Sequence, residues 1–333
     1  MKNILVTGGA GYVGSHTCKA LADAGYCPIT VDNLTTGHDW AVRWGPLEKI
    51  DIRQSERLVD VICRHRVSAV IHFAALSLVG QSFVDPGHYY DVNVGGTLSL
   101  LTAMQATDVR KIVFSSSCAV YGIPEKLPIS EAESQKPINP YGRTKAATES
   151  MLTDFATAHD FRVAALRYFN AAGANPESEI GEAHDPETHL IPLVIETALG
   201  NRPAIDVYGD DYDTEDGTCL RDYIHVNDLA RAHVAALDYL DDQEGFHAFN
   251  LGNGKAYSVL DVISAVENRI GRPVPKRVIA RRQGDPAALY ADASKARQAL
   301  NWQTRESDLA TIVDSAVRWH QDTRQQVKQR KAS

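Results

Sequence analysis

The sequence has no cysteine framework, no excess of basic residues and no long apolar run. Its five cysteines are odd in number and form no Cys-x-x-Cys pair, which argues against a disulfide scaffold and favours a reduced cytoplasm. The 34 basic residues are outnumbered by 42 acidic ones, and the net charge of -8 disfavours a nucleic-acid partner. No apolar stretch approaches the roughly 18 residues that cross a bilayer, and no signal-peptide core follows residue 1. We therefore expect no membrane association.

The composition is otherwise that of a globular chain, with 44% hydrophobic and 23% charged residues, and 333 residues allow about two domains. Short apolar runs indicate strands buried on both faces at 3–7, 28–32, 69–73, 111–115 and 163–168. Helix-like segments lie between them at 13–24, 55–66, 86–106 and 140–159. This alternation predicts an α/β fold, a doubly wound parallel sheet with helices on both faces.

The pattern changes after residue 170. Segment 171–187 is loop-like and 205–220 is rich in turns, a strand is expected at 247–251, and helices are expected at 189–199, 226–240, 257–270, 292–301 and 307–319. We expect a first domain at 1–170, to which the chain returns around 222–250, and a smaller C-terminal α/β substrate domain in 171–333. The tail 321–333 has no core face and is expected to fray.

A glycine-rich turn follows the first strand and opens a helix. Its glycines satisfy both GxGxxG and GxxGxxG, and an ordinary strand–helix turn is the alternative interpretation. Glycine permits the tight turn, the approach of backbone N–H groups to a pyrophosphate, and close helix–strand contact. The anion then lies at a helix N-terminus, where the dipole favours it. The predicted cofactor residues here are Gly8, Gly11, Tyr12, Val13 and Gly14.

Asp32 ends the second strand, about twenty residues after the turn, where an acid can bond a ribose diol. Its charge repels a 2′-phosphate, and the next residues bring no Arg or Lys, so we predict NAD rather than NADP. The ends of the third and fourth strands supply further candidate cofactor residues: Asp51, Ile52, Phe73, Ala74 and Ala75.

Residues 139–145 carry the candidate catalytic pair. Asn139 suits a helix N-cap and Pro140 the first helical position, so Tyr141 and Lys145 share a helix face. A nearby ammonium, the helix N-terminus and an oxidised nicotinamide would lower the pKa of the phenol and make it a base. An exposed Tyr–Lys pair is the alternative. Ser115 and Ser117 end the fifth strand and face the same crevice, where a hydroxyl can hold the reacting oxygen.

These motifs resemble the extended short-chain dehydrogenase/reductase superfamily, whose fold is of the Rossmann type. Segments 167–170, 214–218, 221–226 and 281–285 resemble the UDP-glucose 4-epimerase family within it, and the resemblance runs from residue 1 to about 319. It implies that Tyr141 is the base, that Lys145 binds the nicotinamide ribose and tunes Tyr141, and that Ser117 orients the sugar hydroxyl. It adds Asn33, Asn93 and Tyr168 to the NAD-contact positions. The implied UDP-sugar positions are Asn170, Arg221, Tyr223, Arg282 and Asp285.

The implied reaction is interconversion of UDP-glucose and UDP-galactose by oxidation at C4, rotation of the 4-keto sugar and reduction on the opposite face. Leu289 is implied to limit space near the C2 substituent, predicting weaker turnover of UDP-N-acetylhexosamines. Alternatives are an epimerase for another UDP-sugar (a pentose, uronic acid or N-acetylhexosamine), a sugar-nucleotide dehydratase, a decarboxylase, or a non-catalytic NAD-binding regulator. Cys118-Ala119 lacks the acids of the dehydratases and decarboxylases. The family further implies a homodimer formed through 86–106 and 140–159.

Two positions depart from the family pattern. Ser77 stands where many members have a lysine close to the cofactor, and His189-Leu190 stands where a common pattern has Asn-Leu in the substrate loop. His184 and His189 also raise the question of a metal. Their turn-rich segment has no matching Cys/His set, and we expect ordinary polar residues and no metal.

Overall fold

A computed structural model describes residues 2–282 and 285–332, with side chains described up to residue 322. The chain divides into two compact units. Unit 1 comprises the chain up to Tyr168 together with Leu229–Leu251 and Asp292–Gln303, and unit 2 comprises Phe169–Asp228, Gly252–Ala291 and the chain from Thr304. Among the described residues, no helix is both long and apolar enough to cross a membrane. All five cysteines are free.

Unit 1 is built on a seven-stranded sheet in the order β10-β6-β5-β4-β1-β2-β3, and every neighbouring pair is parallel. In chain order the strands are β1 (Asn3–Thr7), β2 (Cys27–Asp32), β3 (Leu47–Lys49), β4 (Val67–His72), β5 (Lys111–Ser117), β6 (Arg162–Tyr168) and β10 (Gly245–Leu251). The order reverses at β1, because β2 and β3 lie on one side of it and β4, β5 and β6 on the other. The predicted α/β fold with a doubly wound parallel sheet is confirmed.

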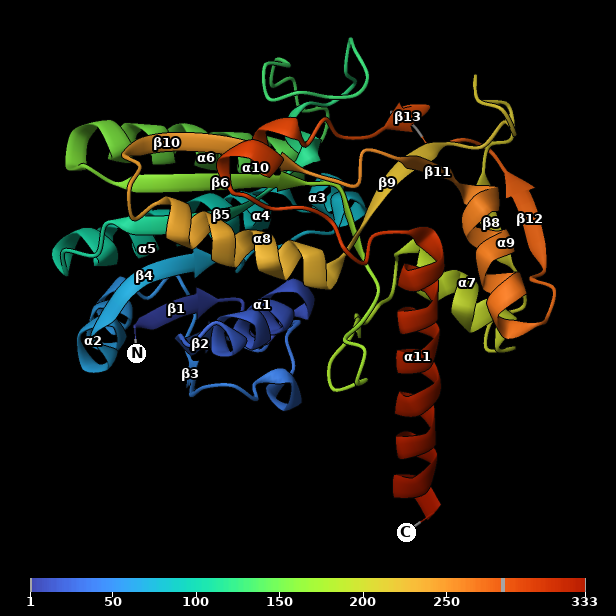
Figure 1. Cartoon of the computed structure of the whole chain (residues 1–333), viewed down its shortest axis with the longest axis horizontal. Coiled ribbons are helices and arrows are strands. Elements are labelled where there is room, and N and C mark those ends of the chain that lie inside the picture. Colours follow the sequence, from blue (N-terminus) through green and yellow to red (C-terminus); the bar gives the residue numbers. More distant parts are fainter. Residues whose placement is uncertain (1, 283–284, 333) are drawn as a thin grey trace. The chain divides into compact units, whose positions relative to one another are not determined.

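Helices cover both faces of this sheet (Figure 1). On one face, α2 (Ser55–His65), α5 (Gly96–Ala106) and α6 (Pro140–His159) pack into a core with the sheet that includes Leu58, Leu100 and Leu152. On the other lie α1 (Tyr12–Asp23) and α8 (Val226–Tyr239), and the Tyr26 hydroxyl, in the loop after α1, donates to Asp238 of α8 at 2.5 Å. Helix α10 (Ser294–Ala299) returns the chain to this unit.

Unit 2 holds two small sheets. In the first, β9 (Leu220–His225) pairs with β7 (Asn170–Ala172), β11 (Ala256–Ser258) and β13 (Ala288–Leu289). In the second, β8 (Ile205–Tyr208) pairs with β12 (Lys276–Ile279). Helices α7 (Leu190–Ala198), α9 (Val259–Ile270) and α11 (Leu309–Ala332) enclose an apolar core that includes Ile195, Val262 and Ile312.

Three expectations about local structure were wrong. The helix expected at 86–106 is split into α4 (Pro86–Tyr90), a π-helical turn Asp91–Gly95 and α5, and a further helix, α3 (Val79–Val84), precedes it. The turn-rich segment 205–220 contains β8, whose apolar residues Ile205 and Val207 are buried. Helix α11 continues to Ala332 where fraying was expected, because residues 321–332 contain neither Gly nor Pro to end a helix.

Candidate active site

The glycine-rich turn of unit 1 leaves space for a ligand to lie against the protein backbone. Gly8 has a φ of +72°, and a Cβ there would lie 2.7 Å from the Ala74 nitrogen. A Cβ on Gly14 would lie 2.1 Å from the Gly8 carbonyl oxygen, so helix α1 reaches the turn only because this residue is glycine. Helix α1 begins at Tyr12, which is followed by Val13, and Gly11 is its N-cap. Gly11 has no side chain to cover the start of the helix. This cradle fits the pyrophosphate of NAD.

Asp32 closes the turn from the end of β2. Its two carboxylate oxygens accept hydrogen bonds from the backbone nitrogens of Ala10 (3.1 Å) and Leu34 (2.9 Å). Burial raises the pKa of this carboxyl, while the two hydrogen bonds oppose the rise. A carboxylate held beside the glycine turn can accept bonds from a ribose diol, as expected for NAD.

The neighbouring side chains form a connected polar edge. The Asn33 amide donates to Asp51 at 3.0 Å, and Arg53 binds Asp51 through Nε (2.9 Å) and Nη2 (2.8 Å). This guanidinium holds the pKa of the Asp51 carboxyl well below its usual range. Arg53 was missed in the sequence analysis because it is distant from Asp32 along the chain. Arg53 also donates to Asp91 at 2.5 Å, so its guanidinium binds two carboxylates.

The residues that follow β4 lie beside the end of β1. The backbone nitrogens of Phe73 and Ala74 both donate to the Thr7 carbonyl, at 2.9 and 3.1 Å. Ala75 is half-buried next to them, and the Phe73 ring lies 4.6 Å from the ring of His233. Ile52 is buried against Gly96, where a Cβ would lie 2.5 Å from its Cδ1 atom. Ile52 therefore contributes to packing as well as standing at a predicted cofactor position.

Helix α6 delivers the predicted catalytic residues from its first turns. The Asn139 side chain accepts from the Gly142 nitrogen at 2.7 Å, which makes it the N-cap, and Pro140 is the first helical residue. Tyr141 and Lys145 then lie one turn apart, with the Lys145 Nζ atom 5.8 Å from the centre of the Tyr141 ring. Lys145 donates to the Ser115 carbonyl at 2.7 Å. The Ser117 side chain lies close enough to Tyr141 to favour a lower pKa of its hydroxyl, and Ser115 is hydrogen-bonded to the Tyr168 hydroxyl at 2.7 Å.

The expected lowering of the Tyr141 pKa is not found in the protein chain alone. Burial raises the pKa of Tyr141 well above its ordinary value, and Tyr168 adds to the rise, while the nearby Ser117 side chain opposes it. Burial likewise lowers the pKa of Lys145 to about 7, although the charge of Glu149 opposes that change. For Tyr141 and Lys145 the free-energy cost of removing each charge from water outweighs the attraction between the two charges, because a buried site disfavours each charged form.

A buried ionic network behind the site was missed in the sequence analysis. Arg167 donates to both oxygens of Glu149, from Nε at 2.9 Å and from Nη2 at 2.5 Å. Ser116 donates to the same carboxylate at 2.5 Å, and Arg167 also donates to the Tyr121 hydroxyl at 2.9 Å. The spacing of four from Tyr141 to Lys145 to Glu149 places all three on one helix face, and this signal was available in the sequence.

Two further buried groups hold the strand ends to the helices. His72 is hydrogen-bonded to Thr7 at 2.6 Å and to Thr97 at 2.8 Å, and burial lowers its pKa to about 3. Asn93, a predicted NAD contact, donates to the Leu76 carbonyl and the Thr144 hydroxyl, each at 3.0 Å, and accepts from the Leu76 nitrogen at 2.8 Å. Its amide thus ties the loop after β4 to helix α6, next to Lys145.

In unit 2, strand β9 gathers most of the predicted substrate residues. Tyr223 is opposite Asn170 of β7, and Arg221 is opposite Leu289 of β13. Arg221 donates to the Leu220 carbonyl at 2.7 Å and is paired with Asp285. Burial raises the pKa of Tyr223 well above its usual value. This arrangement brings together a guanidinium and a phenol on β9 and an amide on the adjacent strand β7.

The other predicted substrate residues lie elsewhere in unit 2. The exposed guanidinium of Arg282 stacks over the Tyr208 ring at 3.8 Å, and Gln283 and Gly284 of the same motif lie outside the described residues. His189 is the N-cap of helix α7, which begins at Leu190, and its ring is bonded to Glu182 and Glu187. Ser77, the departure near the cofactor positions, is exposed.

Comparison with known proteins gives consistent matches over almost the whole chain. UDP-glucose 4-epimerase of Rhizobium meliloti (strain 1021) is 52% identical over 318 residues, which are 96% of this chain and 97% of that protein. The crystal structure of UDP-glucose 4-epimerase from Brucella ovis in complex with NAD has a TM-score of 0.93 at 53% identity, covering 96% of this chain and 98% of that one. The enzyme from Bifidobacterium longum in complex with NAD+ and UDP has a TM-score of 0.92 at 40% identity, with the same coverage.

A model of one family spans most of unit 1 and much of unit 2. It matches residues 4–252, which include the glycine turn, Asp32, the Tyr141–Lys145 pair and strand β9. The motifs read from the sequence, the parallel sheet and the similarity to relatives agree with this match. The chain belongs to the NAD dependent epimerase/dehydratase family.

Proposed function

We propose that this protein is an NAD-dependent isomerase that interconverts UDP-glucose and UDP-galactose at the sugar C4. The observation that carries the proposal is the site made by Ser117, Tyr141 and Lys145 beside a turn that fits a dinucleotide. Relatives at 42–52% identity named UDP-glucose 4-epimerase support the same activity.

Bound NAD supplies a reversible acceptor for the C4 hydride, which lets the same carbon be oxidised and then reduced on its opposite face. Tyr141 takes the C4 hydroxyl proton on its phenolic oxygen and returns it in the reduction step. Ser117, whose side chain lies near Tyr141, orients the reacting oxygen. Lys145 stabilises the phenolate by its charge, because the burial that raises the pKa of Tyr141 must be offset when the proton is removed.

Unit 2 provides the groups that would anchor the nucleotide. Arg221 has five N–H donors, of which Leu220 and Asp285 each take one in this structure, so it has donors for a diphosphate. Arg282 offers a second guanidinium, already oriented by Tyr208. Asn170 and Tyr223 supply an amide and a hydroxyl on adjacent strands. Firm anchoring through UDP allows the 4-keto sugar to turn over while the nucleotide stays bound.

In this proposal the range of UDP-sugars that the enzyme accepts depends on Leu289. It is half-buried on β13 opposite Arg221, and it is shorter than Tyr, bulkier than Ser and unable to hydrogen-bond through its side chain. We therefore propose UDP-glucose and UDP-galactose as the main substrates, with weaker turnover of UDP-N-acetylhexosamines. Excluding one small group is worth about 1–3 kcal/mol, so this preference is graded.

The same site disfavours elimination chemistry. A dehydratase needs an added acid beside the oxidised sugar, but the residues after Ser117 are Cys118 and Ala119, and the Ala119 nitrogen donates to Ser117 at 3.2 Å. Neither residue supplies the carboxylic acid that would protonate a leaving hydroxyl. An epimerase for another UDP-sugar uses the same catalytic residues and is distinguished only by the products formed.

We also propose a cytoplasmic homodimer. Helices α3, α4 and α5 expose Val79, Phe83, Val84, Tyr90 and Leu98, with Val84 85% exposed, and these helices adjoin or include the segment that the family resemblance assigns to the interface. Five free cysteines suit a reducing compartment. Light scattering after gel filtration should give twice the chain mass, and Val84→Glu should shift it toward the monomer.

The deciding experiment mixes the purified protein anaerobically with a panel of UDP-hexoses, UDP-pentoses and UDP-uronic acids and analyses the products. The proposal predicts an equilibrium mixture of UDP-glucose and UDP-galactose starting from either sugar, with no net consumption of NAD. Dehydrated or decarboxylated products, or turnover of pentoses alone, would replace it with one of the alternatives.

A further inference from the structure

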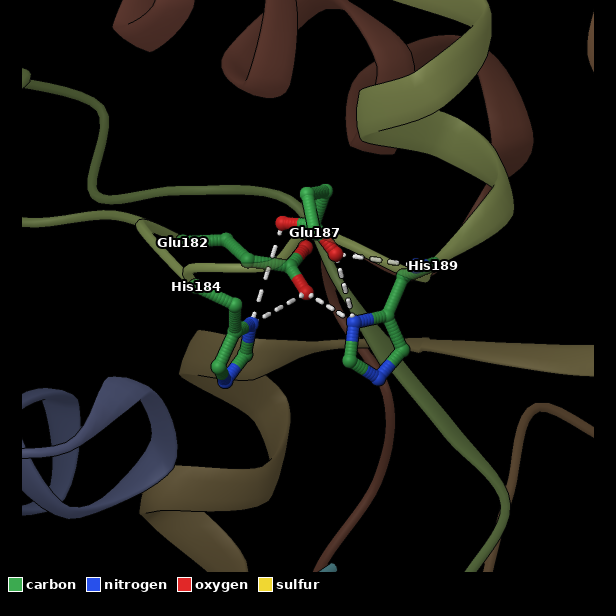
Figure 2. Close-up of side chains that lie close together, drawn as sticks. All are labelled: Glu182, His184, Glu187 and His189. Atoms are coloured by element: carbon green, nitrogen blue, oxygen red, sulfur yellow. Dashed lines mark hydrogen bonds and ion pairs between the residues drawn. The ribbon is translucent and has the colours of Figure 1, made fainter. Parts of the chain in front are cut away.

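Four side chains of unit 2 converge in the loop that precedes helix α7. They are Glu182, His184, Glu187 and His189, and Figure 2 shows a ring nitrogen of each histidine turned toward the two carboxylates. The Glu182 Oε1 atom lies 3.1 Å from Nδ1 of His184 and 2.8 Å from Nδ1 of His189. Glu187 lies 2.9 Å from Nδ1 of His189 through Oε1 and 3.8 Å from Nδ1 of His184 through Oε2. One ligand atom from each of the four residues fits within 4.8 Å of the others.

Protons alone satisfy this cluster poorly. Each Nδ1 atom carries at most one hydrogen, yet each faces oxygens of two different carboxylates. A single cation at the centre can bond one atom of all four residues at once. In a tetrahedral zinc site with ligand bonds of 2.0–2.1 Å, the ligand atoms lie about 3.3 Å from one another. The four distances between nitrogen and oxygen, of which Glu187 makes one through each of its oxygens, bracket that value.

We propose that Glu182, His184, Glu187 and His189 form a binding site for one divalent transition-metal ion of the zinc type. Two imidazoles and two carboxylates are ligands that this class of ion accepts in four-coordinate sites. The expectation of no metal rested on the absence of a matching Cys/His set, and it did not consider carboxylates as partners of the histidines. The ligand spacing Glu-x-His-x-x-Glu-x-His is readable in the sequence.

Charge and burial favour such an ion. Glu182 is 6% exposed and Glu187 is partly buried, so two carboxylates are held close together out of water. With both rings neutral the cluster carries two negative charges, which a divalent ion cancels. Any proton on a ligating ring nitrogen must leave when the ion binds.

The surrounding backbone is fixed in position before any ion binds. The Trp319 indole of helix α11 donates to the Glu182 carbonyl at 2.8 Å, and the Trp319 ring packs on Gly181. The Glu187 Oε1 atom accepts from the backbone nitrogens of Thr188 and His189, at 2.7 and 2.8 Å, which orients that carboxylate. A bound ion would clamp the loop to the start of α7. This site does not depend on the proposed epimerase activity.

The test is titration of the full-length, tag-free and chelator-treated protein with Zn2+ alone, by calorimetry at pH 7.5 in two buffers of different ionisation enthalpy. We expect one ion per chain with an apparent Kd near or below about 10 µM and release of protons on binding. Co2+ in place of Zn2+ should give the intense visible absorption of four-coordinate cobalt. Zn2+ should also raise the Tm of the protein.

His189→Gln and Glu187→Gln should each weaken Zn2+ binding by at least about 10–100-fold and abolish the rise in Tm. His65→Gln is the matched control, because His65 forms a 2.7 Å pair with the single carboxylate Glu48 in unit 1. Circular dichroism checks that each variant is folded. If His189→Gln misfolds, the outcome is decided by Glu187→Gln, which keeps the shape of the side chain. The proposal is overturned if the wild type shows no saturable binding, if cobalt is six-coordinate, or if His65→Gln loses as much affinity as His189→Gln.

Discussion

Arg167 and Glu149 form a two-point ion pair in the interior of unit 1, with N–O distances of 2.9 and 2.5 Å and side chains only 6% and 3% exposed. Arg167 comes from β6 and Glu149 from α6. The Glu149 carboxylate also accepts from Ser116 of β5 and from Gln135 at 2.7 Å. The pair therefore fixes the helix that carries Tyr141 and Lys145 against β6, and the Ser116 bond ties the same helix to β5, which carries Ser115 and Ser117.

Glu149→Gln should lower the free energy of unfolding by about 3–5 kcal/mol, because it leaves the Arg167 charge buried without its partner. Urea denaturation measures the change. Glu125→Gln, which breaks the exposed pair with Lys136, is the control and should leave stability unchanged within error. A loss of similar size in both variants would show that burial of the Arg167–Glu149 pair is not the cause.

Tyr141→Phe should reduce turnover of UDP-galactose by at least about 100-fold, since it removes the oxygen that takes and returns the proton. The glycine turn is untouched, so the variant should retain NAD. Tyr90→Phe, a change on an exposed tyrosine, is the control. Turnover of Tyr141→Phe near the wild-type rate would reject Tyr141 as the base.

Gly14→Ala should abolish binding of the cofactor. The added Cβ would lie 2.1 Å from the Gly8 carbonyl oxygen and would displace the turn. Denaturation followed by mass spectrometry should recover NAD, and not NADP, from the wild type and little cofactor from the variant. Gly80→Ala meets nothing within 4 Å and should retain wild-type NAD. Retention of NAD by Gly14→Ala would mean that the turn does not cradle the pyrophosphate.

Lys145 should make stability rise with pH above neutrality. Burial lowers its pKa in the folded protein to about 7, whereas an unfolded lysine titrates near 10.4. Between these values the unfolded chain binds one more proton, so the free energy of unfolding rises by up to about 1.4 kcal/mol per pH unit.

Lys145→Met should remove this slope. Measured on cofactor-free protein by urea denaturation from pH 6 to pH 9, the stability of the wild type should gain on that of the variant only above about pH 7. Lys126→Met, at an exposed lysine, should follow the wild type throughout. Parallel curves for wild type and Lys145→Met would show that Lys145 remains charged in the folded protein.

Leu289→Tyr should depress turnover of UDP-N-acetylglucosamine more than that of UDP-glucose, and Leu289→Ser should raise the N-acetyl activity. The expected changes in relative kcat/KM are about 10-fold, the size of one small group gained or lost in a pocket. Equal effects of both substitutions on the two substrate pairs would show that Leu289 only packs against the sheet.

The sequence predicted the parts of the molecule whose signals are local. Apolar runs such as 111–115 give buried parallel strands, and Asn139-Pro140 marks the start of α6 within one residue. Strand β9 was not expected as a strand, because Arg221 and Asp222 interrupt its apolar pattern and have partners distant in the chain, such as Asp285 and the Asn253 nitrogen.

The site divides in the same way. Tyr141 and Lys145 could be paired from their spacing, whereas their pKa values depend on burial by segments that the sequence does not place. His72 resembles any polar residue at a strand end until Thr7 and Thr97 are found on either side of its ring. The metal-ligand cluster of unit 2 was recognisable in spacing, but its convergence depends on how the loop folds back beneath α7.

The division of unit 1 into three chain segments has a consequence during synthesis on the ribosome. Strand β6 pairs with β5 on one side and with β10 on the other, and β10 begins only at Gly245. A nascent chain that has emerged through Tyr168 therefore contains the glycine turn and the catalytic helix but presents β6 as an open edge with the apolar run 163–166. Such an edge invites pairing with a second chain. The 76 or so residues that must follow before β10 can cover β6 lengthen the interval in which this edge is open to such pairing.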